Sequence, residues 1–266
     1  MGIKHLLGSV WDYRYFIISS IKSEFLGRFA RSKLGALWAI LNPLAQAMIF
    51  ALVLGQVMGA KLGGGASNAA YPVYLMAGIA AWGLFSEILN RSANIFIEYS
   101  GMMKKIVFPK ISLPLIVWGS ALINHILLLL AIVVVSTVLG HFPGLAWLGL
   151  VPGVLLISMF AFSLGLIAGV FNVFARDIGQ IIAVVLQLWF WLTPIVYQTD
   201  IVPQNLRWIL DINPMAQFVR IYQDAILFDR WPDLLSLAIP VVITVALLIG
   251  GFALFRRAGP ELVDVL

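Results

Sequence analysis

A charge-free stretch from Gln180 to Gln198 is too long and too apolar for the surface of a soluble protein. Its 19 residues, at about 1.5 Å each in a helix, cover most of a hydrocarbon core about 30 Å thick. Five similar stretches occupy about 34–58, 71–96, 111–139, 145–174 and 234–255. Hydrophobic residues make up 62% of the chain, against about 45–50% in a soluble domain. We therefore expect an all-α polytopic membrane protein, a single transmembrane domain over residues 1–266 with six spans.

Two of these predicted spans carry their polar side chains on one stripe. At 100° per residue, an arc of about 60° holds Gln180, Gln187, Trp191, Pro194 and Gln198, and one of about 80° holds Trp38, Asn42, Gln46 and Gln56. An unpaired amide facing lipid costs several kcal/mol, so such a stripe should face water or protein. It lines a pore, or each amide bonds a neighbouring helix.

The second and third predicted spans carry further candidates. One face of about 80° in the second holds Tyr71, Tyr74, Trp82, Phe85 and Phe96, a pattern typical of core packing but also of a surface on which sugar rings stack. Glu87 and Arg91, four residues apart, are expected to form an ion pair. His125, in the third span, is either a functional group or the partner in one interhelical hydrogen bond.

Two amphipathic regions lie outside the predicted spans, one before the first span and one between the fifth and sixth. Over residues 9–31 an arc of about 80° holds Trp11, Tyr15, Ile18, Lys22, Phe25 and Phe29, which suits a helix in the membrane interface or one packed on the bundle. Over residues 202–228, Pro203 and the pair Asn213 and Pro214 signal two short helices, because asparagine caps a helix and proline suits its first position. Neither helix is long enough to cross, so both are re-entrant or interfacial.

The charges sort by side of the membrane. With six spans, 13 of the 17 Lys and Arg residues lie on the side of the two termini, which the positive-inside rule places in the cytoplasm. The net charge of +5 therefore does not indicate nucleic-acid binding. There is no cysteine, the three histidines lie in separate segments, and no GxxxxGK[ST] occurs. We expect no metal site, no cofactor and no nucleotide bound in the Walker manner.

Several runs together resemble one family. They are RSKLGALWAILNP (Arg31 to Pro43), MMKKIVFPKISLP (Met102 to Pro114), FNVFARDI (Phe171 to Ile178), FWLTPIVY (Phe190 to Tyr197) and the NP of Asn213 and Pro214. In order and spacing they resemble the permease subunits of type-2 ATP-binding-cassette exporters for O-antigen, capsule and teichoic-acid polymers. The resemblance implies a homodimer working with two copies of a separate ATPase. It also implies a cytoplasmic interface helix at 9–31, a coupling loop at 98–108 and outer gate helices at 202–228.

The residue patterns and the resemblance together suggest roles for particular residues. The coupling residues would be Glu98, Met102, Met103, Lys104, Lys105, Ile106 and Phe108. The substrate path would include Trp38, Asn42, Gln46, Trp82, Phe85, Gln187, Trp189, Trp191 and Tyr197. Arg176 and Asp177 would fix the turn between the fourth and fifth spans.

The expected function is therefore that of the membrane subunit of an ATP-driven exporter of a lipid-linked polysaccharide, with O-antigen the first expectation, in the inner membrane. An exporter of a drug, an ion or another lipid is the nearer alternative. An intramembrane transferase is the distant one, because it would need carboxylates, histidines or arginines converging near one membrane face. No catalytic residue is expected.

Overall fold

The computed structural model describes residues 8, 10–29, 34–38, 41, 45, 49, 70–106, 108–138, 140–233 and 235–266. Within these residues every regular element is a helix, so the all-α class is confirmed for that part of the chain. Most of the predicted first span, including Asn42 and Gln46, lies outside the described residues.

Among the described residues, four helical stretches are long and apolar enough to cross a membrane. They are α4 (Ala70–Glu98), α6 (Ser112–Val138), the 3-10 turn η3 (Leu145–Gly149) continued by α7 (Leu150–Phe174), and α11 (Ala238–Ala258). The sequence predicted spans at 71–96, 111–139, 145–174 and 234–255, close to these bounds. A shorter apolar helix, α8 (Asp177–Trp191), follows α7.

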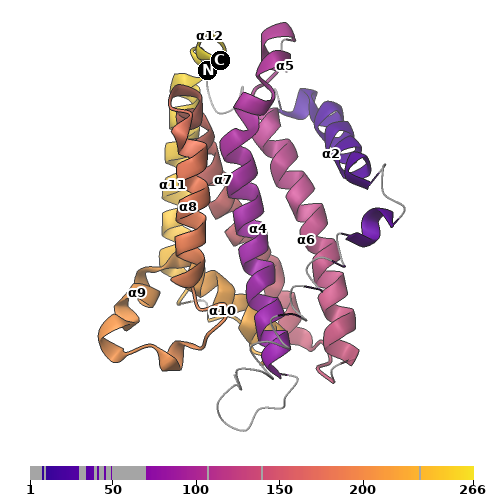
Figure 1. Cartoon of the computed structure of the whole chain (residues 1–266), viewed down its shortest axis with the longest axis vertical. Helices are drawn as coiled ribbons and strands as arrows, with labels where there is room; N and C mark the ends of the chain where they lie inside the picture. Colours follow the sequence, from indigo (N-terminus) through magenta and orange to yellow (C-terminus); the bar gives the residue numbers. More distant parts are fainter. Residues whose placement is uncertain are drawn as a thin grey trace.

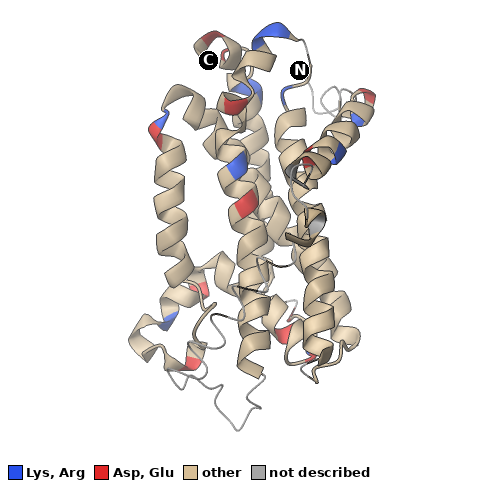
Figure 2. Cartoon of the chain, turned by 45° about the vertical axis from the view of Figure 1, so that its right-hand side comes forward, with Lys and Arg blue, Asp and Glu red and all other residues tan. Residues whose placement is uncertain are grey.

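Short elements gather at the two ends of this bundle (Figure 1). At one end lie α5 (Ser100–Lys105) and the C-terminal α12 (Leu262–Val265), and α2 (Arg14–Phe29) crosses α6 obliquely near it. At the other end lie α9 (Arg207–Ile212) and α10 (Pro214–Ile226), after the 3-10 turns η4 (Thr199–Ile201) and η5 (Gln204–Leu206). A further 3-10 turn, η1 (Gly35–Leu37), follows α2. Charged residues concentrate at the two ends, while most of the helical length between them is uncharged (Figure 2).

Small residues allow α4 and α7 to pack closely at the centre. A Cβ atom on Gly165 would lie 2.6 Å from the Cβ of Ser92, and one on Gly169 would lie 2.6 Å from the Ser92 carbonyl oxygen. No real Cβ is accommodated at such distances, so glycine is required at both positions. Close backbone approach through small residues is how membrane helices gain packing energy without a hydrophobic driving force between them.

The helix of the predicted fifth span differs from expectation at both ends. Helix α8 begins at Asp177 and ends at Trp191, three residues before Pro194. Proline disfavours the helical conformation of the residue before it and donates no backbone hydrogen bond, which explains why the helix does not continue. Pro194 and Gln198 therefore do not belong to the helical stripe predicted for them, and that part of the prediction is wrong.

Candidate functional site

The chain beyond α8 leaves the helix, and side chains from other helices hold its carbonyl groups. We call residues 192–197 the outer segment. Tyr71 Oη donates to the Val196 carbonyl (3.0 Å), and Tyr74 Oη donates to the carbonyls of Pro194 (3.3 Å) and Tyr197 (2.9 Å). Non-helical backbone at membrane depth is tolerated only where protein or water satisfies its polar groups. These hydrogen bonds supply that satisfaction from α4.

Helix α10 holds the outer segment from the other side. Gln223 Nε2 donates to the Pro194 carbonyl at 3.1 Å, and Asn213 Nδ2 donates to the Leu192 carbonyl at 3.1 Å. Ile195 is fully buried and packs against Gly78 of α4. A Cβ atom on Gly78 would lie only 3.1 Å from Ile195 Cγ2. The outer segment is thus clamped between α4 and α10 rather than free to bend as a continuation of α8.

Asn213 uses both ends of its amide. Its Oδ1 accepts from Trp189 Nε1 (2.9 Å) and from the Met215 amide (3.0 Å), and its Nδ2 donates to Thr193 Oγ1 (3.2 Å) besides the Leu192 carbonyl. The bond to Met215 is the N-cap of α10 that the sequence predicted, with Pro214 at the first helical position. No pattern in the sequence indicated that the same amide would also form hydrogen bonds to the end of α8.

The residues predicted for the substrate path fall into two groups in the structure. Phe85 is fully buried, with ring centroids 5.2 Å from Trp189 and 5.7 Å from Phe160. Trp82 is half-buried and contacts Phe85 and Phe190. In the monomer these aromatic rings pack against one another, which is the core-packing alternative for the aromatic face of α4.

The other group is exposed. Gln187 and Trp191 of α8 are exposed, Trp38 is also exposed, and Tyr197 is half-buried with its hydroxyl donating to the Trp191 carbonyl at 3.1 Å. Gln180 lies on the same face of α8 as Gln187 and Trp191 and is exposed too. Leu186 is the only buried residue of α8. One amide-bearing face of this apolar helix is therefore uncovered in the monomer.

The predicted coupling residues lie around α5, at the end of α4. Glu98, Lys104, Lys105 and Ile106 are exposed, and Ile106 exposes 58% of its surface. Met103 is buried at 6% and Met102 is half-buried, so these two methionines face the body of the protein.

Contacts from other segments brace this end of the molecule. The ring of Phe108 lies 5.8 Å from that of Phe16 in α2. Lys110 Nζ donates to the Gly259 carbonyl after α11, and burial there lowers the pKa of Lys110. The turn after α4 is therefore attached to α2 and to the C-terminal segment.

The turn between α7 and α8 is held by a residue that sequence reasoning missed. Arg176 and Asp177 are both exposed, and Asp177 opens α8, where a carboxylate suits the positive end of the helix dipole. Asn172 is buried, donates to the Ala93 carbonyl (2.8 Å) and accepts from the Gly179 amide (2.9 Å). An asparagine near the end of an apolar run was the available signal.

Charged side chains join α2, α4 and α6. The expected pair of Glu87 and Arg91 is present at 3.2 Å, and Arg91 also pairs with Glu24 of α2. Ser120 Oγ donates to Glu24 (3.0 Å) and Asn124 Nδ2 donates to Glu87 (3.0 Å).

The lone histidine of the third predicted span has a protein partner. His125 Nε2 and Tyr222 Oη, both buried, lie 2.9 Å apart and join α6 to α10. This contact is the single interhelical hydrogen bond weighed as the alternative to a functional group. Over the part of the chain that the structure describes, no group of three or more metal-binding side chains occurs.

Long apolar helices, charges confined largely to the ends and a clamped non-helical segment define a multi-pass membrane protein. The model of the ABC-2 type transporter family matches residues 15–227, most of the chain. The chain therefore belongs to the ABC-2 type transporter family, as a transport subunit and not an enzyme, and the family implies an ATPase partner.

Curated relatives with similar sequences carry export names. The "O-antigen export system permease protein RfbA" of Klebsiella pneumoniae is 29% identical over 223 residues, covering 84% of this chain and 83% of that protein. A protein of the same name from Myxococcus xanthus is 28% identical over 263 residues, covering 97% and 98%. The "Polysialic acid transport protein KpsM" of Escherichia coli is 24% identical over 234 residues, covering 88% and 89%.

Proposed function

We propose that this chain forms, as a homodimer, the pore of an exporter that moves a lipid-linked polysaccharide across the inner membrane, with O-antigen as the first candidate. Two copies of a separate ATPase supply the energy. The names of the relatives support the cargo class, since three of them are O-antigen permeases and two are polysialic acid transport proteins.

The observation that carries this proposal is the uncovered face of α8. Gln180, Gln187 and Trp191 are exposed there on a helix whose other exposed residues are mostly aliphatic. Amides facing lipid would cost several kcal/mol, whereas in a homodimer they would face a second copy or a water-filled path. Amides can hydrogen-bond sugar hydroxyls, and the indole ring offers a surface on which sugar rings can stack.

The coupling surface is proposed to be the exposed part of α5 and its flanks, with Glu98, Lys104, Lys105 and Ile106 at its centre. This segment continues directly from α4, so a push on it would reach the bundle without passing through a flexible linker. The distribution of 13 of 17 basic residues supports placing this end and both termini in the cytoplasm.

The proposed outer gate consists of residues 198–212 rather than the whole of 202–228. Helix α10 is packed into the core, with Phe218 and Tyr222 fully buried. In α9, by contrast, Trp208 and Ile212 expose 57% and 65% of their surface. A segment with few buried contacts opens at lower free energy than one in the core, so α9 is the better candidate for movement.

The cargo is tested in cells. Deleting the chain should leave completed, lipid-linked polymer on the cytoplasmic leaflet, and restoring it should return the polymer to the cell surface. Polymer that still reaches the surface in the deletion strain would refute the proposal.

The homodimer is tested with single cysteines, because the chain contains none. Gln187→Cys should cross-link two copies under oxidation. Val242→Cys, on the exposed face of α11 at 67% exposure, is the control and should stay monomeric. Equal cross-linking of the two variants, or none in either, would argue against a dimer formed through α8.

A further inference from the structure

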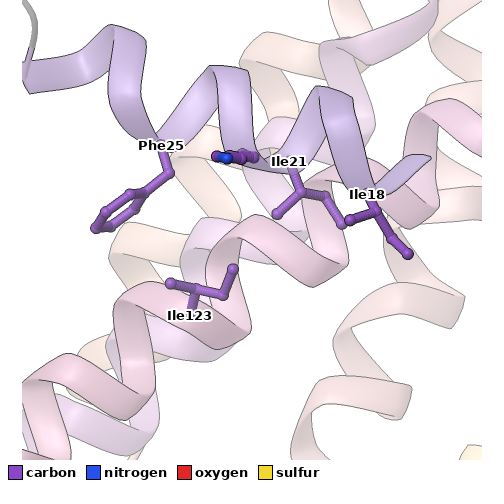
Figure 3. A pocket seen from close by; sticks show the side chains of 5 residues that line it. Ile18, Ile21, Phe25 and Ile123 are labelled. Atoms are coloured by element: carbon purple, nitrogen blue, oxygen red, sulfur yellow. The ribbon is translucent and has the colours of Figure 1, made fainter. Parts of the chain in front are cut away.

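A pocket of about 320 Å³ lies between α2 and α6 (Figure 3). Its lining is Ile18, Ile21, Lys22 and Phe25 of α2 and Ile123 of α6. In Figure 3 the side chains of Ile21 and Phe25 point from α2 toward α6, and that of Ile123 points back toward them. The volume is at the lower end of the range of about 300–1,000 Å³ for small-molecule sites. Apart from Lys22 the lining is apolar, and apolar cavities are poor sites for water.

The two helices approach most closely at one edge of the pocket. A Cβ atom on Gly119 of α6 would lie 2.5 Å from Ile21 Cδ1, so the absence of a side chain there lets α2 settle onto α6. Ile123, one turn further along α6, lines the pocket. The space is therefore bounded on one side by a direct helix contact and open on the other.

Lys22 places a positive charge at this pocket. Its side chain is exposed, and no carboxylate pairs with it in the described part of the chain. Glu24, two residues on, points elsewhere, toward Arg91 of α4 and Ser120 of α6. A long lysine side chain can lie along apolar surface while its ammonium group reaches a polar layer. The pocket thus combines an apolar interior with one uncompensated cation.

An apolar strip continues from the pocket along α6. Ile126, Leu130, Val134 and Val138 share one face with Ile123 and expose 54%, 57%, 63% and 81% of their surface. The strip runs away from the α5 end of the bundle (Figure 1) and reaches the last residue of α6, Val138. A flexible hydrocarbon chain that enters the pocket can follow this strip without meeting a polar group.

From these observations we infer that the pocket binds an anionic glycerophospholipid of the cytoplasmic leaflet, with its phosphate on Lys22 and part of one acyl chain between α2 and α6. The inference uses the proposed placement of α2 at the cytoplasmic surface. Anionic lipids are concentrated in that leaflet and attract basic residues near the membrane surface. The bound lipid would fill the gap between the two helices and hold α2 on α6.

Native mass spectrometry of the purified full-length chain tests this inference. The chain is offered equal amounts of phosphatidylglycerol and phosphatidylcholine in detergent and is then washed. The wild type should retain phosphatidylglycerol with a roughly fivefold preference, the factor expected for one lysine near an anionic headgroup. Lys22→Gln should lose the preference, and Lys22→Arg should keep it.

A second pair of variants tests the pocket independently of the charge. Ile123→Trp fills the space and should abolish retention although Lys22 is present. Val242→Trp, on an exposed face of α11 that belongs neither to the pocket nor to the strip, should retain the lipid. Size-exclusion profiles identify any variant that does not fold.

Three results would overturn the inference. They are equal retention of the two lipids by the wild type, an undiminished preference in Lys22→Gln, and displacement of phosphatidylglycerol by an equimolar polyprenyl phosphate through the same residues. The last result would assign the pocket to the lipid carrier of the proposed cargo. Because no export is measured, failure here is distinguishable from failure of the proposed function.

Discussion

Replacing Asn213 by alanine should destabilise the protein more than any exposed substitution near it. The change removes four hydrogen bonds: those to Trp189 Nε1, the Met215 amide, the Leu192 carbonyl and Thr193 Oγ1. Interhelical hydrogen bonds in membranes average about 0.6 kcal/mol, so four give about 2.4 kcal/mol. Loss of an N-cap alone costs about 1 kcal/mol, and a buried group left unpaired costs about 1–3 kcal/mol. We therefore expect the free energy of unfolding to fall by about 2–4 kcal/mol.

The measurement is reversible unfolding of the purified chain in mixed micelles, followed by helical circular dichroism. Asn205→Ala is the matched control, because Asn205 is exposed just before α9 and its replacement should change stability by less than about 0.5 kcal/mol. Asn213→Asp keeps both acceptor roles and loses both donors, so it should fall between the two. An Asn213→Ala variant as stable as the control would show that the clamp on the outer segment contributes little and would refute the reasoning.

Three further variants test other parts of the molecule. Ile106→Asp changes a side chain beside α5 that exposes 58% of its surface. Loss of a contact worth about 1.4 kcal/mol should lower export per ATP hydrolysed by roughly tenfold. Coupled transport at the parent rate would contradict the assigned coupling surface. Alanine at both Trp191 and Tyr197 should raise the ion conductance of the idle transporter in planar bilayers, because bulky side chains at a constriction exclude water. A double mutant with the parent's conductance would place the seal elsewhere. Gly165→Leu should destabilise the bundle by about 1–3 kcal/mol, because the new Cβ would lie 2.6 Å from the Cβ of Ser92. An unchanged unfolding midpoint would contradict the close packing of α4 on α7.

Some contacts could be predicted from spacing alone and others could not. Glu87 and Arg91 are four residues apart on one helix, so their pairing follows from helix geometry. The second carboxylate on Arg91, from Glu24, lies 67 residues away and depends on how α2 crosses the bundle. Likewise the N-cap of α10 was predictable from Asn213 and Pro214, whereas the bonds from the same amide to the end of α8 were not.

The aromatic face of α4 shows the same limit. Periodicity placed Tyr71, Tyr74, Trp82 and Phe85 together on one face and left open what that face touches. In the folded chain Phe85 packs into the core, while the two tyrosine hydroxyls hold the carbonyls of the outer segment. Gln223, which shares the Pro194 carbonyl with Tyr74, had no distinguishing signal in the sequence.

The sequence by itself determined the membrane class, the approximate positions of the long helices, the capped turn before α10 and the family. These properties depend on residues within a few positions of one another and on the free energy of moving them out of water. Only the tertiary structure decided that α8 stops before Pro194 under a clamp from α4 and α10, that Phe85 and Met103 face inward, and that one face of α8 remains uncovered. Those outcomes depend on which helices pack together, and that packing brings together side chains more than a hundred residues apart, such as Tyr74 and Pro194.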